Sequence, residues 1–157
     1  MRVVVQRVAE ASVEVDGRAV AAIGRGILVL AAFRSGDQGA DLDWMARKCL
    51  ELRIFEDEAG KMNRSVLDEE GSVLVVSQFT LYGDCRRGRR PDFIRSAPAA
   101  EAEALYRKFI DILNMYHPRV AEGVFGATMK VRLVNDGPVT LIVDRGGEDG
   151  GGEARDA

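Results

Sequence analysis

Residues 131–144 read VRLVNDGPVTLIVD, with an apolar side chain at nearly every second position and a Gly-Pro pair in the middle. Alternation of this kind predicts a β-strand. Proline cannot donate to a sheet ladder, so within sheets it stands at edges, turns or bulges. Glycine allows another backbone or a ligand to approach closely. Gly137-Pro138 therefore forms either a trans turn between two strands or a cis bond that turns two carbonyl oxygens in a fixed direction.

Strand patterns also fill the first third of the chain. Valines alternate with other residues around positions 3–5 and 13–15, and Asp16-Gly17 is a strong hairpin signal. Residues 26–33, GILVLAAF, form a continuous apolar run that predicts a buried strand. Residues 72–82, SVLVVSQFTLY, predict a further strand because they are rich in β-branched side chains.

Two segments have the apolar spacing of helices. In residues 41–55 the positions at this spacing are Leu42, Met45, Ala46, Cys49, Leu50 and Arg53. Pro98 suits a first helical position, and His117-Pro118 ends the segment. Its apolar stripe consists of Ala102, Leu105, Phe109, Ile112, Leu113 and Tyr116. The sum is an α+β fold with a mainly antiparallel sheet and two packed helices.

The composition sets limits on the class of protein. The chain has 157 residues and a net charge of −3, which fits one soluble domain and excludes a polycation that grips nucleic acid indiscriminately. No apolar run reaches the ~18 residues of a membrane span, and the first residues carry no secretory signal. Cys49 and Cys85 stand in no metal-binding spacing, which predicts free thiols in a reducing cytoplasm. We expect one domain over residues 1–144, followed by an acidic, glycine-rich, disordered tail over 145–157.

The common catalytic signatures are absent from the sequence. It contains no G-x-x-x-x-G-K-[ST], no H-E-x-x-H and no G-x-S-x-G. The single histidine, His117, lies at a predicted helix end, where a favourable dipole interaction explains it. A Ser-His-Asp triad is therefore not expected.

Residues 77–81, SQFTL, place Ser77, Gln78 and Thr80 at the end of an otherwise apolar strand. In an ordinary turn, backbone groups would satisfy these side chains. In a pocket wall, backbone N–H groups and a hydroxyl would instead meet a carbonyl oxygen of a ligand. Both interpretations fit the composition of the segment.

Residues 86–95, RRGRRPDFIR, hold five arginines: Arg86, Arg87, Arg89, Arg90 and Arg95. A run of charges is often a solvated face. Guanidinium groups also match phosphate oxygens, and Phe93 stands among them. On a mildly acidic chain, this local basic loop indicates a docking patch for an RNA end.

Several motifs together resemble the D-aminoacyl-tRNA deacylases, which clear D-amino acids from mischarged tRNA. The resemblance covers residues 1–144 and rests on QRVAEASVEVDG, GKMNRSVLDEEG, VVSQFTLYGD, GRRPDF and GVFGATMKVRLVNDGPVT. It implies a cytoplasmic homodimer of β-barrel-like α+β subunits that acts on the 3′ end of aminoacyl-tRNA. It also implies that the enzyme needs no metal and no organic cofactor.

The resemblance assigns roles to particular residues. A cis Gly137-Pro138 would reach into the pocket of the other subunit and exclude an L side chain at the α-carbon, while Arg7 steadies it. The segment containing Phe125 and Met129 would line the pocket mouth. The ester would be held by Ser77, Gln78, Phe79 and Thr80. The tRNA would contact Arg86, Arg87, Arg89 and Arg90.

The resemblance also implies chemistry that needs no histidine. Backbone amides near Phe79 and Thr80 would polarise the ester carbonyl, and the adjacent ribose hydroxyl of the tRNA would assist. Thr80 as a covalent nucleophile is the weaker alternative, because no base is present to activate it. Glycine has no side chain to reject, so glycyl-tRNA is expected to be a substrate too.

Two other functions stay open at this point. One is a related editing deacylase that removes L-alanine from the wrong tRNA, although SQFTL and NDGPVT here have the D-type form. The other is a module that binds RNA ends or small ligands without turnover.

Overall fold

Strand β1 (Arg2–Val15) organises the sheet of the protein. The computed structural model describes residues 1–146. The first half of β1 lies between β3 (Gly26–Ala32) and the end of β8 (Met129–Asp144). Its second half lies between β2 (Arg18–Ile23) and the start of β8. One strand therefore holds β2, β3 and β8 together.

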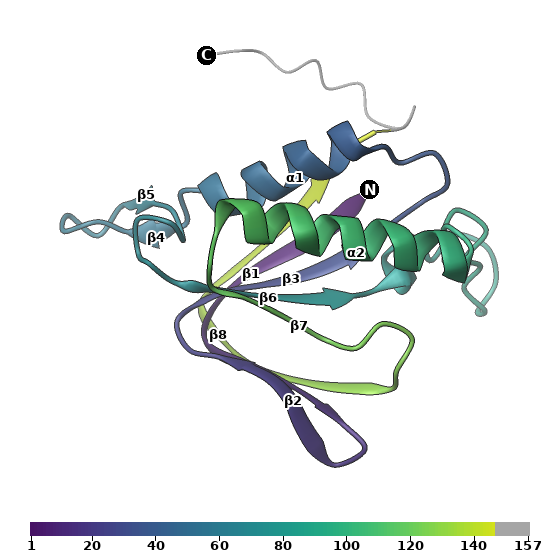
Figure 1. Ribbon diagram of the computed structural model, residues 1–157, viewed down its shortest axis with the longest axis horizontal. Helices are drawn as coiled ribbons and strands as arrows, with labels where there is room; N and C mark the ends of the chain where they lie inside the picture. Colours follow the sequence, from purple (N-terminus) through teal and green to yellow (C-terminus); the bar gives the residue numbers. More distant parts are fainter. Residues whose placement is uncertain (147–157) are drawn as a thin grey trace.

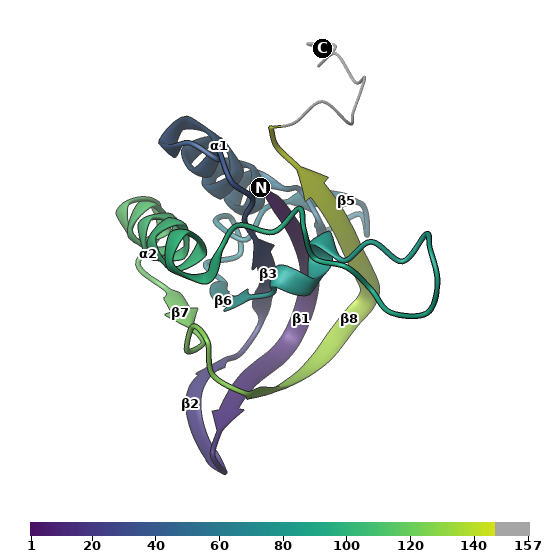
Figure 2. The same ribbon diagram turned by 90° about the vertical axis from the view of Figure 1, so that its right-hand side faces the viewer.

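The sheet is mixed, which corrects the expected mainly antiparallel arrangement. β6 (Ser72–Ser77) pairs in parallel with β3, and β7 (Val120–Glu122) pairs in parallel with β6. In each case a helix lies between the two strands in the sequence, and a helical crossover returns the chain in the same direction. Figure 2 shows that the sheet is strongly curved and nearly closes into a barrel.

Helices α1 (Gly39–Glu51) and α2 (Ala99–Tyr116) pack side by side on one face of the sheet (Figure 1). Their apolar stripes bury most of the residues that the helical spacing predicts, among them Met45 and Phe109. The prediction was wrong for Arg53, which is exposed beyond the end of α1, and for Tyr116, which is exposed at the end of α2. The α2 stripe also includes Tyr106, whose hydroxyl donates to the Val75 carbonyl at 3.1 Å. The two helices and the first half of β1 thus enclose the larger core cluster.

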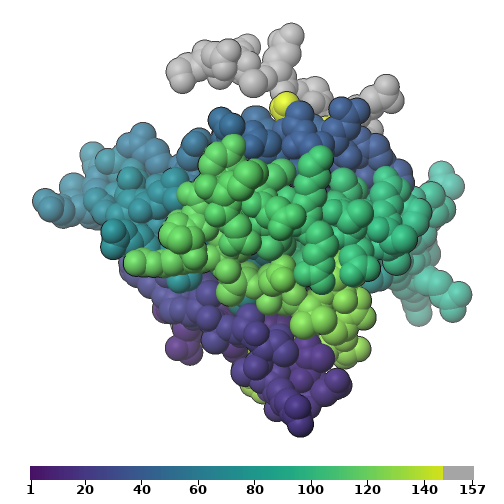
Figure 3. Space-filling view, viewed as in Figure 1, coloured from purple at the N-terminus to yellow at the C-terminus, as the bar shows by residue number. Residues whose placement is uncertain are grey.

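The β1–β2 hairpin forms the narrow lower end of the molecule (Figure 3). Asp16 and Gly17 both have positive φ, +50° and +77°, as a tight hairpin turn requires. A second core cluster, which includes Val8, Val13 and Leu74, lies inside this end. A small separate hairpin, β4 (Phe55–Glu56) and β5 (Met62–Arg64), follows α1.

His117 has a structural role at the end of α2. It is buried, and its Nε2 lies 2.8 Å from the Gly71 carbonyl oxygen. Both cysteines are free, Cys49 buried and Cys85 exposed, and burial raises the pKa of the Cys49 thiol to about 12. None of these three side chains lines the pocket described below.

The last described residues close the domain against its first residue. Arg145 donates its backbone N–H to the Met1 carbonyl at 2.8 Å, and its guanidinium lies over the Trp44 ring. The remainder of the expected disordered tail, residues 147–157, lies outside the described residues.

Candidate active site

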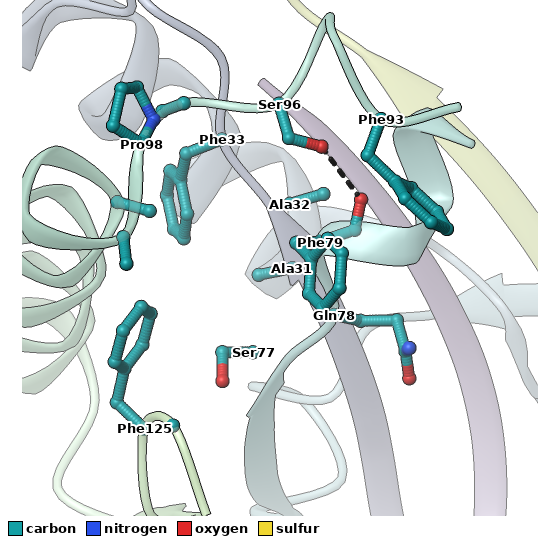
Figure 4. Close-up of a pocket in the computed structure, with 14 residues that line it drawn as sticks. Ala31, Ala32, Phe33, Ser77, Gln78, Phe79, Phe93, Ser96, Pro98 and Phe125 are labelled. Atoms are coloured by element: carbon teal, nitrogen blue, oxygen red, sulfur yellow. Dashed lines mark hydrogen bonds between the residues drawn. The ribbon is translucent and has the colours of Figure 1, made fainter. Parts of the chain in front are cut away.

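A pocket of about 460 Å³ opens where β3 and β6 end. The start of α2 and the loop before β8 complete it (Figure 4). Within residues 1–146, the side chains that line it include no ionisable group. The lining residues are Ala31, Ala32, Phe33, Ser77, Gln78, Phe79, Phe93, Ser96, Ala97, Pro98, Ala99, Ala102, Phe125 and Gly126.

The polar wall of the pocket forms where the chain leaves the sheet. The strand expected over residues 72–82 ends at Ser77, which is a correction. The Gln78 N–H still donates to the Ala31 carbonyl at 2.7 Å, and the 3₁₀ helix η1 (Phe79–Tyr82) then begins. Helical bonds from Leu81 N–H to Gln78 O and from Gly83 N–H to Thr80 O replace the sheet ladder. The turn places Ser77, Gln78 and Phe79 in the pocket lining.

Thr80 lies on η1 but is not one of the pocket-lining residues. The Gln78 side-chain amide donates to its hydroxyl. Tyr82, at the end of the same helix, has its pKa raised to about 12 by burial, so its phenol stays neutral at physiological pH. Among the described residues, the Thr80 hydroxyl thus bonds to an amide, and an amide cannot act as a base near neutral pH.

Two aromatic rings cover one side of the pocket. Phe79 is exposed and meets Phe93 edge to face, with 5.0 Å between ring centroids. The Ser96 hydroxyl donates to the Phe79 carbonyl at 3.1 Å (Figure 4). The sequence does not point to Ser96, because nothing local in its segment distinguishes it.

The segment before and at the start of β8 divides between two places. Phe125 lines the pocket, and its ring lies 5.7 Å from that of Tyr106. Met129 instead pairs with Val15 and packs against the second core cluster. The structure therefore brings Phe125, but not Met129, to the pocket of its own chain.

Gly137 and Pro138 stand on an outward bulge in β8. Gln6 pairs with Thr140 and Val8 with Asn135, so the residues between those partners on β8 face only one residue of β1. The Gly137-Pro138 bond is cis, and Gly137 has φ +143°, a conformation that L side chains rarely adopt. Both residues are exposed, and neither lines the pocket of its own chain.

Arg7 lies opposite the bulge and is 6% exposed. Its Nε donates to the Asp136 carbonyl at 2.7 Å, and Nη1 donates to the Ile54 carbonyl at 2.6 Å. The guanidinium thus joins the bulge to the segment that precedes β4. A Cβ built on Gly137 would lie 3.0 Å from Arg7 Nη2, so glycine allows this close approach.

Asn135 holds the base of the same bulge, and sequence reasoning missed it. Its Oδ1 accepts from the Val139 N–H and its Nδ2 donates to the Thr140 hydroxyl, each at 2.9 Å. The residue lies within the quoted NDGPVT motif, so an amide beside the Gly-Pro pair was the available signal. Side-chain bonds here replace the ladder bonds that the bulge interrupts.

The arginine loop, residues 83–98, lies between η1 and α2. Asp84 and Asp92 close it with two backbone hydrogen bonds of 2.8 and 3.1 Å. The Asp84 carboxylate pairs with Arg86, which lowers the pKa of that carboxyl to about 2. The side chains of Arg87, Arg89 and Arg90 are exposed.

Features of a metal site or a membrane span do not occur in the part of the chain that the structure describes. Within residues 1–146, no three His, Cys, Asp or Glu side chains gather where they could hold a metal ion. In the same range neither helix has the length and apolarity to span a bilayer.

Proteins of known sequence and structure resemble this chain over most of its length. A D-aminoacyl-tRNA deacylase of Thermomicrobium roseum is 59% identical over 92% of this chain and 94% of its own. That of Geobacter sulfurreducens is 57% identical over 92% and 95%. The solved structure of a c-Myc DNA unwinding element binding protein has a TM-score of 0.89 at 43% identity, covering 94% of this chain and all of that one.

A second structure shows the same fold at lower identity. The probable eukaryotic D-amino acid tRNA deacylase has a TM-score of 0.81 at 22% identity, over 92% of this chain and 98% of that one. The class to which the curated relatives belong is that of the aminoacyl-tRNA deacylases. A family model described as D-Tyr-tRNA(Tyr) deacylase matches residues 4–144, and the chain belongs to this family.

Proposed function

We propose that this protein hydrolyses the ester of D-aminoacyl-tRNA to free tRNA and a D-amino acid. The observation that carries the proposal is a pocket without ionisable side chains, bounded by the start of η1, in a chain of this family. Such a pocket can hold and polarise an ester but supplies no acid, base or charged nucleophile. An ester activated by its own neighbouring hydroxyl is the substrate that suits it.

The chemistry uses backbone groups and the RNA. Phe79 and Thr80 are the first residues of η1, where N–H groups have no acceptor within the helix. Their amides polarise the ester carbonyl and stabilise the oxyanion as it forms. The free ribose hydroxyl next to the ester assists the attack of water, and Thr80 forms no covalent intermediate.

The Gly137-Pro138 bulge acts in the pocket of a second subunit. Three observations support this: the bulge is exposed, it is held by Arg7 and Asn135, and it lies outside the pocket of its own chain. Strand β8 around it exposes four apolar side chains that a second copy would cover. They are Leu133, Val134, Leu141 and Ile142.

Selection then takes place at the α-carbon of the amino acid. Carbonyl oxygens of the partner's bulge accept a hydrogen there and leave no room for an L side chain, whereas a D side chain points to solvent. The amino-acid side chain is not read, so several D-amino acids are substrates. Glycine that is mischarged on a non-cognate tRNA is also removed, because glycine has no side chain to reject.

The test compares D-tyrosyl-tRNA, L-tyrosyl-tRNA and L-alanyl-tRNA in a deacylation assay, with the solution mass measured in parallel. We expect turnover of the D-ester only, by a dimer. Preferential turnover of the L-alanyl ester would favour the related editing activity. Binding of all three substrates without turnover would favour an RNA-end binding module.

A further inference from the structure

We propose that Ser96 is a positioning residue, which orients the peptide group between Phe79 and Thr80 for the reaction. This inference rests on the proposed function, in which the Thr80 N–H is one of the two donors to the oxyanion. Ser96 acts through the peptide group and needs no contact with the substrate. Two observations support this role: Ser96 lines the pocket, and its hydroxyl donates a hydrogen bond to η1.

The first step is the geometry of one peptide plane. The Ser96 hydroxyl donates to the Phe79 carbonyl oxygen at 3.1 Å. In a trans peptide the carbonyl of one residue and the N–H of the next lie in one plane and point in opposite directions. A donor that fixes the Phe79 carbonyl therefore also fixes the direction of the Thr80 N–H.

The second step is the weakness of η1 without this bond. The helix has four residues, and 3₁₀ helices have poorer hydrogen-bond geometry than α-helices. Its turn bonds use the carbonyls of Gln78 and Thr80, which flank the Phe79 carbonyl. The Ser96 hydroxyl supplies a donor to the carbonyl between them, so the orientation of that peptide group depends on a side chain from another segment.

The third step is that Ser96 is itself held in place. Its N–H donates to the Phe93 carbonyl, and the N–H of Ala97 donates to the Phe33 carbonyl, each at 3.0 Å. The Phe93 ring packs against the Phe79 ring, which fixes the segment to η1 a second time. The hydroxyl is therefore presented from a segment that is anchored to Phe33, directly after β3, as well as to η1.

The test measures kcat and KM for D-tyrosyl-tRNA in Ser96→Ala and Ser96→Thr. Removal of an oxyanion donor costs about 10²–10³ in rate, and a donor that is only misoriented should cost less. We expect Ser96→Ala to lower kcat by about 10–100-fold with an unchanged KM. Ser96→Thr keeps the hydroxyl and should restore most of the rate.

Ser35→Ala provides the matched control, and thermal melting is followed for every variant. Ser35 also donates its hydroxyl across segments, to Glu101 at 2.9 Å, and this hydrogen bond does not involve η1. We expect the control to keep the wild-type kcat. Equal rates of Ser96→Ala and wild type would overturn the positioning role while the proposed function stands. A Ser96→Ala variant with a raised KM and an unchanged kcat would also overturn the positioning role. A Ser96→Thr variant that melts like the wild type but keeps a low kcat would overturn it too. An inert wild-type protein would overturn both proposals.

Discussion

The pocket wall at the end of β6 and the bulge in β8 are both breaks in a strand, yet they are stabilised in different ways. At the end of β6 the chain leaves the sheet, and apolar side chains such as Phe79 and Phe93 pack around the turn. In β8 the strand continues on both sides, and the polar side chains of Arg7 and Asn135 hold an exposed bulge. Apart from the Ser96 hydrogen bond, the wall depends on packing and should tolerate a small polar change such as loss of the Thr80 hydroxyl, whereas a bulge held by a few directed bonds should not.

The largest effect is expected from Gly137→Ala in the bulge. A Cβ there would lie 2.8 Å from the Val139 side chain and 3.0 Å from Arg7 Nη2, at a φ of +143°. A displacement of the bulge by about 1 Å should lower kcat/KM for D-tyrosyl-tRNA by about 10²-fold. The free energy of unfolding should fall by only about 1–3 kcal/mol, because the strain is local.

Gly60→Ala is the control for the strained backbone. Gly60 also has positive φ, +72°, but a Cβ there would meet nothing within 4 Å. The Gly60→Ala variant should melt at a slightly lower temperature than the wild type and should keep the wild-type activity. If Gly137→Ala kept full activity, the bulge would be no part of a site, and the difference between the two regions would be only structural.

The next effect concerns the affinity for tRNA, which we attribute to the arginine loop and not to the pocket wall or the bulge. Replacing Arg87, Arg89 and Arg90 with Gln should weaken tRNA binding and flatten its dependence on salt. The slope of log K against log salt should fall by about 0.7–0.9 for each phosphate that an arginine no longer neutralises. Adding Arg86→Gln should change the slope least, because that guanidinium is already paired with Asp84.

A control with the same change of charge uses Arg18, Lys61 and Lys108, which are exposed elsewhere on the molecule. Binding measured over a salt series should leave its slope close to that of the wild type. If both triple variants flattened the slope equally, the loop would contribute only through net charge. The pocket and the bulge would then have to account for recognition of the RNA end.

A smaller effect is expected from Thr80→Ala in the pocket wall. The substitution removes the hydroxyl that accepts from Gln78 but keeps the backbone N–H. Turnover of D-tyrosyl-tRNA should fall by less than about tenfold, well below the 10²–10³ that accompanies loss of an oxyanion donor. A dead variant with a trappable acyl-enzyme would make Thr80 the nucleophile.

A modified substrate sharpens the same test. A D-aminoacyl-tRNA whose terminal ribose lacks the free hydroxyl next to the ester should bind and resist cleavage. Rapid hydrolysis of this substrate would show that the ribose hydroxyl takes no part in catalysis. The proposed specificity for D-esters would still stand.

The smallest effect is expected from pH. The pocket lining has no ionisable side chain, so kcat should show no bell-shaped profile between about pH 5 and 8. The Asp84–Arg86 pair adds no inflection there. Its carboxyl pKa is lowered from 3.8 to about 2, so its contribution to stability is complete above pH 3.8 and is lost as pH falls through 2. Two inflections in that window would indicate a catalytic acid and base.

The sequence predicted where helices and strands lie better than it predicted whether neighbouring strands pair in parallel or antiparallel. Apolar spacing located both helices, and Asp16-Gly17 located the first hairpin, because these signals depend on neighbouring residues. The parallel pairing of β3 with β6 was not foreseen, since strand direction depends on how α1 crosses the sheet. The strand expected to continue past Ser77 ends there for a similar reason: the hydrogen bonds of η1 that replace the sheet ladder form only in the folded chain.

The candidate site shows the same division. Ser77, Gln78 and Phe79 line one pocket with Phe125, whereas Thr80 and Met129 do not line it. Arg7 donates to the Asp136 carbonyl beside the Gly-Pro pair. Ser96 and Asn135 emerged only from the structure, because each acts through hydrogen bonds that form only in the folded chain. The sequence around a hydroxyl or an amide in a loop does not predict such a hydrogen bond.

The central position of β1 has a consequence for synthesis of the protein. Its partners lie at both ends of the chain: β2 and β3 follow at once, but β8 pairs Arg2 with Asp144. During translation the first residues must wait for nearly the whole chain before the sheet is complete. Contacts of such wide sequence separation slow folding and leave a strand edge unpaired in the meantime. The nascent protein is therefore most exposed to aggregation just before β8 emerges.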